Sequence, residues 1–168
     1  MNEKRLRIYV EDHLAMMVAE VELTGRCMRN NRKTPLCEFL QQLENEVKAQ
    51  QSIASDIIHR IGGKDTIESR LKQGAAWFAE KLGRLKLNDS LLTYSDLSRV
   101  VELETLAAAA QERVALWDNL HAVEDSDSRL EGITFCYFRD QSEQHLNELN
   151  TRRRFAAVEA LLGKQGTN

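Results

Sequence analysis

Proline is almost absent from this chain: Pro35 is the only one among 168 residues. Because proline disrupts helix interiors, long stretches of this sequence are free to be helical. Ala, Leu, Glu, Arg and Gln are abundant, and no run alternates β-branched or aromatic residues with polar ones, as a strand would. We therefore predict an all-α fold. The length is sufficient for one core, so we expect a single helical-bundle domain over residues 1–168.

Apolar residues recur at three- and four-residue steps in four long stretches, which predicts four amphipathic helices. Their expected ranges are about 4–29, 35–61, 95–123 and 128–162. Thr34 is suited to cap the second helix, with Pro35 at its first position, and Gly62 is suited to end it with a left-handed residue. Ser95 or Asp96 is expected to begin the third.

The connection between the second and third helices is long, whereas the first two helices are joined by a short turn. This spacing predicts a four-helix bundle with ferritin-like wiring, in which a helical crossover at about residues 64–95 runs along the bundle. A capping box at Asp65 and Glu68 would begin the crossover helix. Trp77 or Phe78 would then cover apolar surface left open by the main helices. The alternative is an up-down bundle in which this fifth helix packs as an equal.

Ferritin-like di-metal proteins place a Glu on each of two helices and a Glu-x-x-His on each of the other two. One carboxylate on each predicted helix lies at or near the apolar stripe, and His121 lies on the third stripe. The candidate metal ligands are Glu20, Glu46, Glu104, His121 and Glu143.

The histidines do not follow the di-metal pattern. Ala49 and Leu146 stand where a histidine should follow Glu46 and Glu143. His121 is also explained as favourable charge near the C-terminal end of a helix dipole. We therefore expect no cofactor, and a degenerate di-iron or di-manganese oxidase, binding Fe or Mn, is the alternative.

Other catalytic signatures are missing: there is no G-x-S-x-G, P-loop or dinucleotide fingerprint. Ser142 and His145 are neighbours on one helix, but a regular helix offers no oxyanion hole. We interpret His13 and His145 as hydrogen-bonding histidines. The protein is therefore expected not to be an enzyme.

Charge and cysteine content limit the possible partners. The formal net charge of −3 gives no reason to expect nucleic acid or an anionic membrane. The run Arg152–Arg154 cannot share one helix face, and Arg153 is expected to pair internally with Glu20 or Glu46. The three cysteines lack a C-x-x-C spacing, which predicts free thiols. We expect a cytoplasmic protein without a membrane span or targeting segment.

Four stretches carry a family resemblance: "RIYVEDHLAMMVAEVEL", "TPLCEFLQQLENEV", "QGAAWFAEKLGRLKLN" and "LSRVVELETL". Together they resemble a family of short, uncharacterised bacterial helical-bundle proteins described as ferritin-like. The resemblance implies the fold but brings no activity and no catalytic residues. The departure from both Glu-x-x-His motifs argues against a ferroxidase or iron-storage role.

These observations predict a non-enzymatic bundle that acts through its surface as an accessory or stress-related interaction protein. Leu116, Leu120 and Phe155 lie off their stripes and would be buried across a homodimer interface. Besides the oxidase, a carrier of lipid or a small ligand between the helices is an alternative.

Overall fold

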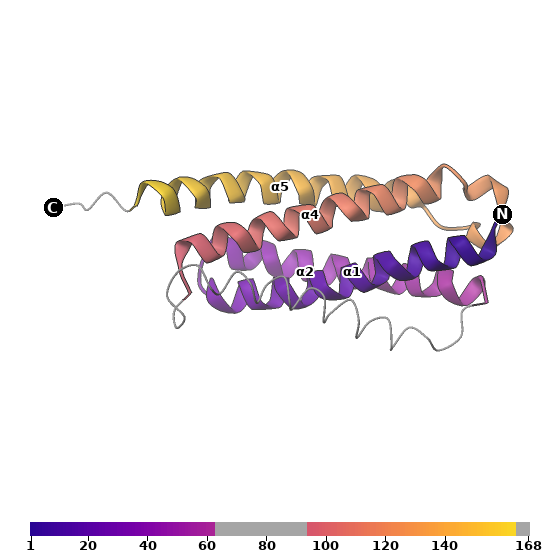
Figure 1. Cartoon of the computed structure of the whole chain (residues 1–168), viewed down its shortest axis with the longest axis horizontal. Coiled ribbons are helices and arrows are strands. Elements are labelled where there is room, and N and C mark those ends of the chain that lie inside the picture. Colours follow the sequence, from indigo (N-terminus) through magenta and orange to yellow (C-terminus); the bar gives the residue numbers. More distant parts are fainter. Residues whose placement is uncertain (63–93, 164–168) are drawn as a thin grey trace.

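The computed structural model describes residues 1–62 and 94–163. Four α-helices form these ranges: α1 (Glu3–Asn30), α2 (Pro35–Arg60), α4 (Asp96–His121) and α5 (Phe135–Leu162). Two short 3₁₀ helices, η1 (Glu124–Ser126) and η2 (Ser128–Leu130), lie between α4 and α5. The helices lie along one long axis (Figure 1). The predicted all-α, four-helix architecture is confirmed.

Local sequence chemistry sets most helix ends. The Thr34 side chain accepts a hydrogen bond from the backbone N–H of Cys37, and Pro35 occupies the first turn of α2. Gly62 follows α2 with φ +78°, the left-handed conformation expected of it. Ser95 and Ser98 form a reciprocal capping box at the start of α4.

The predicted start of the last helix was wrong. The sequence placed it at about residue 128, whereas α5 begins at Phe135. The intervening residues form η1 and η2, and Gly132 takes a left-handed φ of +80° that an α-helix cannot contain. Arg60 holds this connection in place by donating to the carbonyls of Arg129 and Glu131.

The helices pack as two antiparallel hairpins, α1 with α2 and α4 with α5, and α1 also packs against α4. Contacts between the hairpins fix the directions: α1 runs antiparallel to α4, and α2 runs parallel to α4 (Figure 1). The end of α2 and the start of α4 therefore lie at opposite ends of the bundle. The predicted crossover at about 64–95, including Trp77 and Phe78, falls almost entirely outside the described residues.

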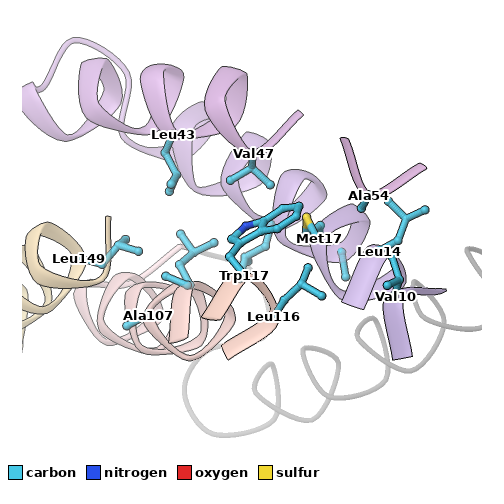
Figure 2. Close-up of a cluster of buried hydrophobic side chains, with 14 of the residues drawn as sticks. Val10, Leu14, Met17, Leu43, Val47, Ala54, Ala107, Leu116, Trp117 and Leu149 are labelled. Carbon is cyan, nitrogen blue, oxygen red and sulfur yellow. The ribbon is translucent and has the colours of Figure 1, made fainter. Parts of the chain in front are cut away.

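Buried residues recur at alternating steps of three and four, the spacing found where side chains of neighbouring helices interlock. This spacing relates Leu40, Leu43, Val47, Gln50, Ala54 and Ile57 of α2, and continues to Ile61 just after the helix; Ile58 is buried as well. Figure 2 shows Trp117 of α4 among the apolar side chains of this core, with Val47 and Met17 nearby. None of the described helices is long and apolar enough to cross a membrane.

Two of the three residues assigned to a dimer interface lie in the core instead. Leu116 and Leu120 are buried, because α4 contacts both α1 and α5 and so buries a wider arc than one stripe. Phe155 is exposed, as expected.

Candidate functional site: a buried polar layer

A fully buried arginine lies in the middle of the bundle. Arg113 of α4 is 1 % exposed, and Glu20 of α1 beside it is 0 % exposed. The Nε of Arg113 donates to one carboxylate oxygen of Glu20 at 2.8 Å, and the Nη2 of Arg113 donates to the other at 3.0 Å. This bidentate geometry is the strongest form of a charge-assisted pair and fixes the orientation of both side chains.

The remaining nitrogen of Arg113, Nη1, faces α2 and α5. It lies 3.2 Å from Gln50 Oε1, 3.0 Å from Ser142 Oγ and 3.2 Å from His145 Nδ1. All four helices therefore contribute to one level of the core, which we call the Arg113 layer: Glu20, Gln50, Arg113, Ser142 and His145.

Gln50 ties the layer to its surroundings. Its Oε1 also accepts a hydrogen bond from the indole nitrogen of Trp117 at 2.8 Å, and its Nε2 donates to Gln141 at 2.8 Å. Ser142 donates to the carbonyl of Phe138, one turn earlier on α5, at 2.7 Å. The hydroxyl proton of Ser142 is thus committed to the backbone and its oxygen to Arg113, so this serine is not placed as a nucleophile.

The arrangement fixes the tautomer of His145. A guanidinium can only donate, so Nδ1 facing Arg113 must accept, and the proton of the neutral ring is on Nε2. Nε2 then donates to Oε2 of Glu46 on α2. Burial lowers the pKa of His145 and Arg113 lowers it further, against the opposing effect of Glu46. Burial likewise raises the pKa of Glu20, with Arg113 opposing that shift.

A second, smaller cluster connects α1 and α4 nearer the end of the bundle. Arg26 donates to the buried carboxylate of Glu102 at 2.7 Å, and the Tyr94 hydroxyl donates to its other oxygen at 2.9 Å. Asn31 donates to Tyr94 at 2.9 Å and to the carbonyl of Cys27 at 2.7 Å. Burial and the neighbouring Glu102 raise the pKa of the Cys27 thiol to about 12, so it is an unreactive core thiol.

The structure separates the five candidate metal ligands. Glu20 binds Arg113, and Glu46 binds His145 and Gln42. Glu104 is exposed and lies 3.7 Å from Arg153.

His121 pairs with Glu124 on the surface at 2.8 Å, and Glu143 is exposed. Within residues 1–62 and 94–163, no three His, Cys, Asp or Glu side chains gather closely enough to hold a metal ion. This placement offers no support for the di-metal alternative.

The predicted internal pairing of Arg153 with Glu20 or Glu46 was wrong. Arg153 lies on the flank of α5, near Glu104 and Asn150. Arg152 packs over the ring of Phe39 at 4.6 Å and pairs with Glu148, whereas Arg154 is exposed. The three arginines thus face different neighbours, as the helical spacing predicted.

The predicted hydrogen-bonding role is confirmed for His145, whereas the contact seen for His13 is aromatic packing. His13 is partly buried and packs edge-on against Tyr9, at 4.6 Å between ring centres. His145 lies in the core, where it hydrogen-bonds two charged residues.

Sequence reasoning missed Arg113 and Gln50 altogether, although a signal was present. Arg113 lies three residues after Ala110 and four before Trp117, the same alternation that marks the buried positions. Gln50 holds the equivalent position between Val47 and Ala54.

Comparison of the chain with protein-family models, curated proteins and solved structures finds no match. The resemblance to short ferritin-like proteins therefore does not identify a family. What the structure shows is a four-helix all-α protein with a polar layer at its centre.

Proposed function

We propose that this protein is a non-enzymatic, ferritin-like helical-bundle protein that acts through its surface as an accessory interaction protein, and that it works as a homodimer. The observation that carries the proposal is a group of exposed apolar side chains at the end of α5. The Arg113 layer supports the non-enzymatic part of the proposal, because the side chains of that layer bind one another rather than lining a space for a substrate.

Four large apolar side chains, which we call the α5 apolar end, are each more than half exposed. They are Phe155 (69 %), Val158 (57 %), Leu161 (74 %) and Leu162 (76 %). Their steps of three and four place them along one side of the last two turns, away from the buried Ala156. A contiguous apolar patch on an otherwise polar surface commonly marks an interaction site.

A second copy of this chain is the partner that suits this surface best. The C-terminal end of α5 projects past the ends of the other three described helices (Figure 1). A two-fold dimer needs one self-complementary patch, and an apolar patch meets this need.

Size-exclusion chromatography with light scattering tests the proposal. The unmodified chain and the control Tyr137→Glu, which changes an exposed aromatic residue near the other end of α5, are expected at the mass of a dimer. Phe155→Glu is expected at the mass of a monomer with unchanged helix content. A monomeric unmodified chain, or a dimeric Phe155→Glu variant, would contradict the dimer through this surface.

A further inference from the structure

The exposed side of α5 changes character along its length. Residues at alternating steps of four and three form one exposed stripe on this helix: Asp140, Gln144, Asn147, Thr151, Arg154, Val158 and Leu161. The stripe is polar or charged as far as Arg154 and apolar after it. Phe155 and Leu162 lie directly beside its apolar part. The α5 apolar end therefore occupies only the last two turns of a side that is otherwise polar.

This pattern discriminates between the two orientations in which two copies can pair through α5. A two-fold axis parallel to the helices gives a parallel pair, in which each residue of the stripe faces its own copy. Asp140 would then face Asp140 and Arg154 would face Arg154, which is unfavourable. A two-fold axis perpendicular to the helices gives an antiparallel pair. When this pair is centred on the apolar residues, only the last two turns overlap, and the two bundles extend in opposite directions.

The end of α5 has a charge that also favours the antiparallel pair. The last carbonyl groups of a helix have no partner within it, and they give its C-terminal end a partial negative charge. The last turn of α5, which ends at Leu162, contains no basic residue. Arg154 is exposed on the stripe, eight residues before that end. In an antiparallel pair centred between residues 158 and 159, each Arg154 lies alongside the last turn of the partner's α5, where its positive charge is favourable.

We propose that two copies pair end to end: the α5 apolar end of one copy packs antiparallel against the same residues of the other, with each Arg154 beside the C-terminal end of the partner's α5. This inference rests on the homodimer proposed above and specifies its contact surface and its orientation. The result is an elongated dimer that is joined through one helix of each chain. Its outer ends carry the connections between α4 and α5.

A distance between spin labels on the two copies tests the orientation. Tyr137→Cys places a label near the other end of α5, and Cys37→Ser with Cys136→Ser leaves Cys27, which is buried and unreactive. An antiparallel pair places the two labels about 65 Å apart, at about 1.5 Å per residue from the centre of the contact. A parallel pair would place the two α5 axes about 8–10 Å apart along their whole length, with the labels close together. Double electron–electron resonance measures this distance.

Light scattering on the same labelled sample separates this inference from the dimer itself. A dimer with the longer distance is the expected result, and Phe155→Glu in this background should abolish that distance. A dimer with the shorter distance would overturn the antiparallel pairing and leave the proposed dimer standing. A monomer would contradict both.

Arg154→Gln tests the charge contact through the sign of its effect. The antiparallel dimer loses two contacts between a cation and a helix end, so its dissociation constant, measured by sedimentation equilibrium at low salt, should rise by about three- to thirtyfold. A parallel dimer would instead lose a repulsion and bind more tightly. Arg5→Gln, which removes an exposed arginine at the other end of the bundle, is the control and should leave the constant unchanged. An unchanged or lower dissociation constant for Arg154→Gln would overturn the proposal.

Discussion

Removing Glu20 alone should be among the most damaging single changes in this core. In Glu20→Leu, Arg113 keeps its three neighbours at Nη1 but loses the acceptors of Nε and Nη2. Two buried donors without partners cost about 1–3 kcal/mol each. The charge of an arginine that is 1 % exposed also loses its counter-ion, and breaking such a pair costs about 3–5 kcal/mol in all. That is a large fraction of the roughly 5–15 kcal/mol that stabilises a typical domain.

Removing both partners should be much less harmful than removing one. The double variant Glu20→Leu/Arg113→Met leaves no uncompensated charge, and replacing a buried ion pair by apolar residues is often neutral or stabilising, by about 1–4 kcal/mol. Gln50, Ser142 and His145 lose a donor, which has a cost. Apart from that cost, we expect the free energy of unfolding of the double variant to match or exceed that of the unmodified protein. The losses of stability in the two single variants, Glu20→Leu and Arg113→Met, should therefore not add up in the double variant.

Urea unfolding at neutral pH, followed by circular dichroism, measures this. Glu104→Leu is the matched control, because Glu104 also lies near an arginine, Arg153 at 3.7 Å, but its side chain is about half exposed. Exposed pairs contribute only about 0–1 kcal/mol. If Glu20→Leu costs no more than Glu104→Leu, or if the double variant loses the sum of both single losses, the reasoning about the Arg113 layer is refuted.

Four further changes test the local structure, each by its effect on the urea midpoint. Ser95→Ala removes the capping box of α4 and should cost about 1 kcal/mol, so an unchanged midpoint would contradict the cap. Gly62→Ala forces a side chain into a φ of +78° and should cost about 1–2 kcal/mol. By contrast, Gly25→Ala inside α1 meets only the end of Arg29 at 3.5 Å and should stabilise the protein by about 0.5–1 kcal/mol. If Gly25→Ala lowered the urea midpoint and Gly62→Ala raised it, the argument from backbone conformation would be refuted. Leu103→Ala should cost about 2–5 kcal/mol, and a loss below 1 would show that α4 packs differently.

Helix ends were predictable from sequence where their chemistry is local. Thr34, Gly62 and Ser95 each act through their own backbone or side chain within a few residues, so the sequence contains the whole interaction. The start of α5 lacks such a signal: Thr134 precedes the helix, but its side chain makes no capping hydrogen bond. The position of Phe135 is instead set by η1, η2 and the turn at Gly132.

The polar layer was harder to predict because it joins distant residues. Glu20 and Arg113 are 93 positions apart, and His145 and Glu46 are 99 apart. Patterns of apolar residues count an inward-facing arginine as a surface residue, so the criterion that located the core also concealed Arg113. The heptad-like spacing would have marked Arg113 and Gln50 as inward. Their partners could not be chosen without knowing which helices are neighbours and in which direction each runs.

Two ion pairs between α1 and α4, one buried and one partly buried, contain part of that missing information. Along α1 the order is acid then base, Glu20 then Arg26, and along α4 it is again acid then base, Glu102 then Arg113. When the helices run antiparallel, each acid meets a base, as observed. Parallel helices would place Glu20 beside Glu102 and Arg26 beside Arg113, with like charges buried together, which is strongly unfavourable. Since each hairpin is itself antiparallel, this charge order also sets α2 parallel to α4. The buried charges therefore select the arrangement of the two hairpins, which apolar packing alone would leave open.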